Sequence, residues 1–154
     1  MSENQSLPFD HPRFRSWIAV GRACQSMQAA LTKALAPLGL KPQHLDVMVN
    51  LYRFEGLTQQ ELARKLLVGR SNVSMTLPQL EKRGLIERQG DAVDRRILRL
   101  KLTPSGRRTA EQAMAIQTAL IEAVLSPAPM EHCTIVAETM EAMVPRLQAF
   151  EKSL

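Results

Sequence analysis

Two long apolar seams, one near each end of the chain, constrain the fold more than any other feature. From about His11 to Leu38, apolar or small side chains recur at a three-four spacing that only Gln28 interrupts, at positions 14, 17, 21, 24, 31, 35 and 38. Near the carboxyl end the spacing is typical of a coiled-coil seam, in the residues Cys133, Val136, Met140, Met143, Leu147 and Phe150. Both spacings predict long helices. Each seam needs a second surface, either from this chain or from another copy of it.

The composition also favours helices. Only 4% of the 154 residues are aromatic, so the core must consist mainly of Leu, Ala, Val, Ile and the eight Met residues. Two cysteines are too few for a disulfide framework, and the first ten residues lack the basic and apolar regions of a signal peptide. No apolar run approaches the roughly 20 residues of a membrane helix. We expect a mainly α-helical cytoplasmic protein without a membrane partner.

The middle of the chain begins with two helices of different length. Pro42 opens the first of them, and Gly56 ends it. Thr58 and Glu61 have the spacing of a capping box, in which the hydroxyl and the carboxylate each accept a backbone N–H at the start of a helix. A short helix should therefore follow Thr58.

A third helix completes a helix-turn-helix. Val68 and Gly69 provide a tight connection to it, Gly84 ends it, and its inner face carries Val73, Leu77 and Leu80. Pro78 lies inside this helix, where it removes one N–H and crowds the preceding turn, so we expect a kink there.

The next segment predicts a β-hairpin. Residues 85–89 and 96–102 form two short runs on either side of a polar turn, and the second run alternates leucine with other side chains. Thr103 and Pro104 then cap a helix that runs to about Leu125. Ser126 and Pro127 should open a last helix that ends near Phe150.

The positive charge is concentrated in this middle part. Residues 53–108 hold 13 basic and 6 acidic side chains, a net charge of +7, whereas the whole chain has a net charge of +5. A surplus confined to one segment favours a polyanionic partner such as DNA, although a solvated face without a partner remains the alternative.

A helix-turn-helix followed by a two-stranded wing resembles the MarR family of bacterial transcriptional regulators. The motifs that carry the resemblance are Leu57-Thr58, Glu61-Leu62-Ala63, Leu66, Arg70-Ser71-Asn72-Val73-Ser74, the run from Leu80 to Ile86, Asp94-Arg95-Arg96 and Leu102-Thr103-Pro104-Ser105-Gly106. The spacing from Asp94 through Arg96 to Gly106 is the most specific of them. Lys41 departs from the family, which commonly has Thr at this helix start. The resemblance covers about residues 12 to 150.

The resemblance implies that the third helix of the middle part reads the major groove. Asn and Gln can pair with adenine, Arg can pair with guanine, and Thr or Met can contact a thymine methyl group. The predicted contacts on this helix are Arg70, Ser71, Asn72, Ser74, Met75, Thr76, Gln79 and Arg83. Solvated helix surface is the alternative for each of them.

The wing should add a contact in the minor groove, whose negative potential attracts guanidinium groups. Arg95 and Arg96 lie at its predicted tip. The resemblance implies that Asp94 hydrogen-bonds Arg96 and holds it extended, with a plain surface ion pair as the alternative. We expect Arg88, Arg99, Lys101, Arg107 and Arg108 to contact phosphates or solvent.

One such lobe has too little surface for tight specific binding, so we predict a homodimer on a pseudo-palindromic operator. The predicted organisation is an amino-terminal arm at 11–40, a winged helix-turn-helix lobe at 41–106, and carboxyl-terminal dimerisation helices at 107–154. Residues expected in the dimer interface are Phe14, Ile18, Val136, Met140, Met143, Leu147 and Phe150.

The resemblance also implies regulation by a small aromatic or anionic effector, bound where the arms meet the lobe. Candidate pocket residues are Arg15, Trp17, His44, Met48 and Tyr52, for which plain core or surface is the alternative. Some relatives sense peroxide through a cysteine, but Cys24 falls on the apolar seam, which favours a buried structural thiol.

Enzyme activity is not expected, because the sequence contains no recognisable set of nucleophile, base and oxyanion donors. Cys133 follows His132, yet no further ligand has metal-site spacing, so we expect neither a metal nor a cofactor. The leading interpretation is a ligand-responsive repressor. Its alternatives are a winged-helix scaffold that does not read DNA, and a redox-sensing regulator that uses Cys24.

Overall fold

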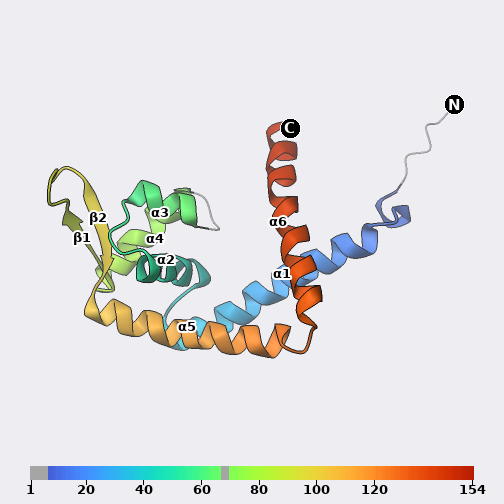
Figure 1. Cartoon of the computed structure of the whole chain (residues 1–154), viewed down its shortest axis with the longest axis horizontal. Coiled ribbons are helices and arrows are strands. Elements are labelled where there is room, and N and C mark those ends of the chain that lie inside the picture. The colour runs from blue at the N-terminus through green and yellow to red at the C-terminus, as the bar shows by residue number, and fades with distance from the viewer. Residues whose placement is uncertain (1–6, 67–69) are drawn as a thin grey trace. The chain divides into compact units, whose positions relative to one another are not determined.

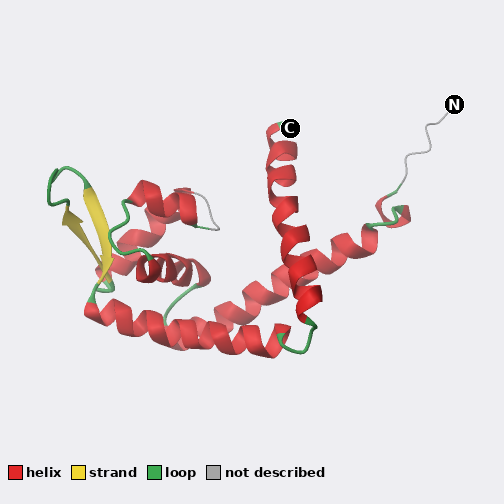
Figure 2. Cartoon of the chain, in the orientation of Figure 1, coloured by secondary structure: helices red, strands yellow, loops and turns green. Residues whose placement is uncertain are grey.

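The computed structural model describes residues 7–66 and 70–154 and is mainly helical, with one antiparallel hairpin (Figures 1 and 2). The elements are η1 (Pro8–Asp10), α1 (Phe14–Leu35), η2 (Ala36–Leu38), α2 (Pro42–Arg53), α3 (Gln59–Lys65), α4 (Arg70–Lys82), β1 (Ile86–Gly90), β2 (Leu98–Leu102), α5 (Pro104–Leu125) and α6 (Met130–Lys152). The predicted fold class, a winged helix-turn-helix between long terminal helices, is confirmed in its element order.

The first long helix ends as the sequence predicts. α1 gives way at Leu35 to the short 3-10 turn η2, and Gly39 follows with φ at 65°. This left-handed conformation suits glycine, which has no Cβ to clash with the backbone. The turn redirects the chain into α2, whose first residue is Pro42.

The predicted capping box at the start of α3 is confirmed. Glu61 donates its backbone N–H to Thr58 Oγ1 at 3.2 Å, and Thr58 donates its own N–H to Glu61 Oε2 at 2.9 Å. α4 continues through Pro78 to Lys82, and the kink expected at Pro78 stays a prediction. The predicted connection at Val68 and Gly69 lies outside the described residues.

The wing is a two-stranded ribbon whose register pairs Ile86 with Leu102 and Gly90 with Leu98. Leu57 forms an isolated bridge with Leu100, so the segment after α2 also pairs with β2. This pairing fixes the base of the wing on the body of the lobe.

The Thr103-Pro104-Ser105-Gly106 motif joins the wing to α5. Thr103 Oγ1 accepts the Gly106 N–H at 2.9 Å and donates to the Gly84 carbonyl at 2.6 Å. The Thr103 N–H donates to the Leu85 carbonyl at 3.0 Å. A Cβ on Gly106 would lie only 1.8 Å from that carbonyl oxygen, so no side chain fits at this position.

The lobe has a contiguous apolar core. Its fully or almost fully buried side chains come from the end of α1 through the first half of α5, and the largest are Leu35, Leu45, Met48, Leu51, Leu62, Leu77, Leu80 and Leu100. The inner-face assignment of Val73, Leu77 and Leu80 on α4 is therefore confirmed.

The chain divides into two compact units, Met1–Ile116 and Gln117–Leu154. The predicted three-part division at 11–40, 41–106 and 107–154 stays a prediction. In the second unit the last helix begins at Met130, and the expectation that Ser126 and Pro127 open it is wrong. Pro129 is the reason, because a proline disfavours helical geometry in the residue before it.

Candidate nucleic-acid interface

The outer face of α4 carries three exposed side chains of described position on its first two turns. Asn72, Ser74 and Met75 are all exposed, and Met75 retains 67% of its accessible surface. Arg70 and Ser71 begin the helix, but their side chains lie outside the described residues. This face can present an amide, a hydroxyl and a thioether to a groove.

Thr76 does not belong to this face, and its predicted role as a groove contact is wrong. Its exposed fraction is only 2%. Thr76 lies three residues after Val73 and four before Leu80, so helical periodicity places it beside these core residues. The inner face of α4 is thus wider than the three apolar positions alone indicated.

Gln79 is exposed, but its side-chain amide already has a partner in the lobe. Gln79 Oε1 lies 2.8 Å from His44 Nε2. His44 Nδ1 accepts the Lys41 backbone N–H at 2.9 Å, so the neutral ring carries its proton on Nε2 and donates it to Gln79. The predicted groove contact of Gln79 would have to use its NH2 group.

The His44 ring is buried, and burial lowers the pKa of His44 below its ordinary value. The hydrogen bond to Gln79 raises the pKa, whereas the positive charges of Arg83 and Lys41 lower it further. Protonation at Nδ1 would also remove the acceptor for the Lys41 N–H.

The free energy of unfolding should therefore depend on pH through the protonation of His44. The folded chain favours the neutral ring. The contribution of His44 to stability is therefore fully present above about pH 6.5, the pKa of histidine in the unfolded chain, and falls as the pH drops below that value. We expect wild type to lose more stability than His44→Gln between about pH 7.5 and about pH 5.5 in urea unfolding. Glutamine can still accept the Lys41 N–H but does not titrate. Equal losses in the two proteins would contradict this assignment.

Arg83 also turns away from a groove contact. Its Nη1 donates to the Gly39 carbonyl at 2.8 Å, and its Nη2 donates to the Leu38 carbonyl at 2.9 Å. The guanidinium thereby caps the carbonyl groups at the end of η2. Arg83 connects the end of α4 to the junction between α1 and α2.

The tip of the wing carries the fork that the family resemblance implied. Arg96 donates from Nε to Asp94 Oδ1 and from Nη2 to Asp94 Oδ2, both at 3.0 Å, and its backbone N–H reaches Oδ1 at 3.1 Å. These bonds lower the pKa of Asp94. The Arg96 side chain nevertheless remains 91% exposed. Asp94 thus fixes the direction of a cation that is still open to solvent.

Two basic side chains expected to contact phosphate or solvent have partners within the lobe. Arg88 donates to Glu81 at 2.9 Å and to Gln59 at 3.1 Å, which ties β1 to α4 and α3. Arg99 donates from Nε to Asp91 at 2.6 Å and from Nη1 to the Gly56 carbonyl at 3.0 Å. Asp91 was not among the predicted site residues, although its place in the polar turn marks it as a turn-forming residue.

Comparison with known proteins finds similarity to transcriptional regulators. A family model described as MarR family matches residues 38–97. MdtR, an HTH-type transcriptional repressor of Bacillus subtilis (strain 168), is 29% identical over 102 residues, which are 66% of this chain and 66% of MdtR. The crystal structure of CouR from Rhodococcus jostii RHA1 bound to p-coumaroyl-CoA is 26% identical, has a TM-score of 0.75, and covers 90% of this chain and 95% of CouR. The chain is similar to the MarR family over residues 38–97.

A second structure, of the transcriptional repressor CouR bound to a 23-mer DNA duplex, is 27% identical. Its TM-score is 0.68, and the match covers 82% of this chain and 89% of that one. The match to MdtR spans just under two thirds of MdtR's own length, so the similarity covers only that part of MdtR.

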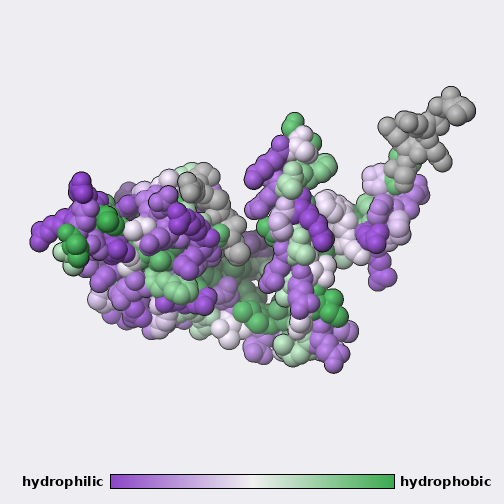
Figure 3. Space-filling model, turned by 45° about the horizontal axis from the view of Figure 1, so that its top comes forward, coloured by the Kyte–Doolittle hydropathy of each residue, from purple (hydrophilic) through white to green (hydrophobic). Residues whose placement is uncertain are grey.

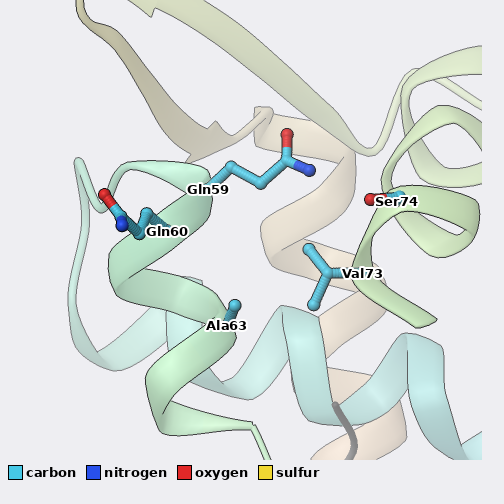
Figure 4. Close-up of a pocket in the computed structure, with 5 residues that line it drawn as sticks. All are labelled: Gln59, Gln60, Ala63, Val73 and Ser74. Atoms are coloured by element: carbon cyan, nitrogen blue, oxygen red, sulfur yellow. The ribbon is translucent and has the colours of Figure 1, made fainter. Parts of the chain in front are cut away.

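The lobe has an open pocket of about 380 Å³ between α3 and α4. It is lined by Gln59, Gln60, Ala63, Val73 and Ser74. Figure 4 shows Gln59 reaching from α3 toward α4, while Gln60 points away from the space between the two helices. None of the five predicted effector-pocket residues lines this pocket.

Those five residues do not converge within the single chain. Met48 is fully buried and His44 nearly so, whereas Trp17 is 62% exposed and Arg15 is also exposed. α1 is 22 residues long and buries only Leu35 near its end, so its first turn lies on the order of 25 Å along the helix from that contact.

Tyr52, the remaining pocket candidate, belongs to a cluster that links α2 to α5. Tyr52 Oη donates to Glu111 Oε1 at 2.9 Å, and the Arg107 guanidinium lies 4.6 Å from the centre of the Tyr52 ring. Sequence reasoning missed Arg107 and Glu111 here, because only the fold brings α5 beside α2.

The long helices α1 and α6 expose apolar side chains. None of the seven predicted interface residues is buried in the single chain, and Phe150 is 66% exposed. Apolar and polar surface alternate along α6 in Figure 3. Cys24 is exposed too, so its expected burial is wrong for the single chain. The reason is that, among the described residues, α1 buries only Leu35 near its end, so the seam around Cys24 stays exposed in the single chain.

The described residues contain no group of three or more His, Cys, Asp or Glu that could hold a metal ion. In that same part of the chain, no single helix is long and apolar enough to cross a membrane. The bent pair of α5 and α6 meets that test only when the two helices are taken together.

Proposed function

We propose that this chain is a DNA-binding transcriptional regulator that acts as a homodimer on a pseudo-palindromic operator. The observation that carries the proposal is the Asp94–Arg96 fork, which holds an exposed guanidinium at the tip of a wing beside a helix-turn-helix. The MarR-family relative CouR was crystallised with a DNA duplex, which supports the same partner. Both MdtR and CouR are described as repressors, so repression is the proposed direction.

The proposed contacts follow the exposed groups. Asn72 can pair with adenine and Met75 can contact a thymine methyl group in the major groove. Ser71 and the amino end of α4 suit a phosphate, since helix amino termini attract anions. Arg96 enters the minor groove, where Arg95 adds charge.

A second copy of the chain is the proposed cover for the apolar arms. Val136 is 51% and Leu147 is 49% exposed, and both lie on the seam that also contains Met140 and Met143. Burial of apolar surface of this kind drives association. Phe14 and Ile18 on α1 are the proposed contribution of the amino-terminal arm.

The proposed signal is a small aromatic or anionic effector. CouR was crystallised with p-coumaroyl-CoA, which contains both an aromatic ring and phosphates. In this chain, Tyr52 and Arg107 place an aromatic ring and a cation together where α2 meets α5. An effector that prefers one arrangement of the dimer would shift the equilibrium between arrangements. Such a regulator would act in the cytoplasm, where bacterial DNA lies.

The test is binding to the DNA upstream of the chain's own gene, measured by fluorescence anisotropy beside random DNA of equal length. We expect tighter binding to the upstream DNA, with affinity falling about tenfold or more between about 50 mM and about 200 mM salt, because bound cations displace counterions from phosphates. Salt-independent binding, or equal binding to both DNAs under every condition including added effector candidates, would favour the protein-interaction scaffold.

A further inference from the structure

The turn of the wing contains a carboxylate with an unusual number of hydrogen bonds. Asp91 Oδ2 accepts the backbone N–H groups of Val93 and Asp94, both at 3.0 Å. Asp91 Oδ1 accepts from Arg99 Nε at 2.6 Å. The Asp91 N–H donates to the Ile97 carbonyl at 2.8 Å, which closes the turn from its other side.

These bonds connect the tip of the wing to the body of the lobe. Arg99 donates its Nη1 to the Gly56 carbonyl at 3.0 Å, and the Gly56 N–H donates to the Leu100 carbonyl at 3.0 Å. At the tip of the wing, Asp94 accepts a hydrogen bond from Arg96. Hydrogen bonds thus connect five residues in sequence, from Gly56 through Arg99, Asp91 and Asp94 to Arg96.

A carboxylate at this place is unfavourable for binding DNA by charge alone. Phosphates repel it, and its partner Arg99 is a cation that could otherwise have neutralised a phosphate. The cost is offset only if the carboxylate organises something that DNA binding needs. The bonds to the backbone of Val93 and Asp94 lie directly next to the fork that aims Arg96.

We propose that Asp91 is a positioning residue for DNA recognition: it fixes the backbone of the wing turn so that Asp94 holds Arg96 in the direction of the minor groove. The proposal rests on the proposed function, since it deepens the role of the wing. Asp91 touches no DNA itself and acts through Asp94 and Arg96. Its pKa agrees with this engagement, because the bonds from Arg99 and from the turn amides lower the pKa of Asp91 to about 2.

The first experiment compares two variants that each remove one carboxylate from the wing. Asp91→Ala removes the proposed positioning group, and Glu87→Ala is the matched control on β1, whose carboxylate accepts from the Gln89 side chain at 3.1 Å. Charge removal alone strengthens DNA binding in both. We expect Asp91→Ala instead to weaken operator binding by roughly fivefold or more, a size typical of coupled neighbours, while Glu87→Ala binds equally or more tightly.

A double variant isolates the pathway through Arg96. In an Arg96→Ala background, Asp91→Ala should cause no further loss of operator affinity, because the group that it positions is absent. A loss as large as in wild type would overturn the proposal. Tighter binding by Asp91→Ala in the wild-type background would overturn it as well.

A measurement without DNA separates this proposal from the proposed function. Backbone and Arg96 Nε heteronuclear NOE values report order on the picosecond to nanosecond timescale. We expect them to fall for residues 93–96 in Asp91→Ala and to stay unchanged in Glu87→Ala. Unchanged order in Asp91→Ala overturns the positioning role. Lost order in a protein that prefers no operator supports the positioning of the wing and defeats the proposed function.

Discussion

Replacing Gly106 by alanine is expected to destabilise the lobe by about 3 kcal/mol or more, since the new methyl group cannot be accommodated without moving backbone. Its Cβ would lie 1.8 Å from the Leu85 carbonyl oxygen and 2.7 Å from the Leu85 carbonyl carbon. Relief requires separation of α5 from the start of β1. That movement breaks the bonds of Thr103 to Gly84 and Leu85.

The free energy of unfolding in urea measures this effect, and Ser105→Ala is the matched control. Ser105 precedes Gly106 in the same turn of α5 but is exposed, so its replacement should change stability by less than about 0.5 kcal/mol. Similar stability of the two variants would show that α5 can shift away from Leu85 at little cost, contrary to the close approach described above.

Arg96→Ala should weaken operator binding at least about tenfold while leaving the oligomeric state unchanged, because it removes the cation that Asp94 holds and that we propose enters the minor groove. Arg96→Lys keeps the charge but cannot form the planar fork, so most of the loss should remain. Fluorescence anisotropy with operator and random DNA measures the affinity, and gel filtration measures the oligomeric state.

Arg95→Ala is the control for charge at the wing tip. It removes an equal charge from the neighbouring position and should produce a smaller and sequence-independent loss. Equal losses from Arg95→Ala and Arg96→Ala would mean that the wing acts by charge alone. Unchanged affinity in Arg96→Ala would remove the wing from the proposed interface.

Features set by local sequence were predictable in this chain. The capping box of Thr58 and Glu61 depends on residues three apart, and the Asp94–Arg96 fork on residues two apart. The hairpin follows from two short runs and a polar turn. In each case the interacting groups are close in sequence, although the fork was expected from the family resemblance and not from the spacing.

Contacts between distant segments were not predictable in the same way. Arg83 and Gln79 looked like groove contacts on a helical projection, but their partners lie 35 to 45 residues earlier in the chain. Thr76 looked polar enough for the outer face, yet the core of the lobe surrounds it. A count of basic residues cannot distinguish Arg88 and Arg99, which have partners in the lobe, from the exposed Arg96.

The bonds from α4 to the α1–α2 junction limit how an effector could alter DNA binding. Sliding α4 along its axis would break the contacts of Arg83 with Leu38 and Gly39 and that of Gln79 with His44. Rotation of the whole lobe about the end of α1 preserves all of them. In a dimer, such a rotation changes the distance between the two lobes and their relative orientation about the DNA axis, while each lobe stays rigid. The orientation matters because B-DNA turns by about 35° per base pair. A bound effector would therefore change the spacing between the two α4 helices so that it no longer matches the spacing of the half-sites, while each lobe could still contact its own base sequence.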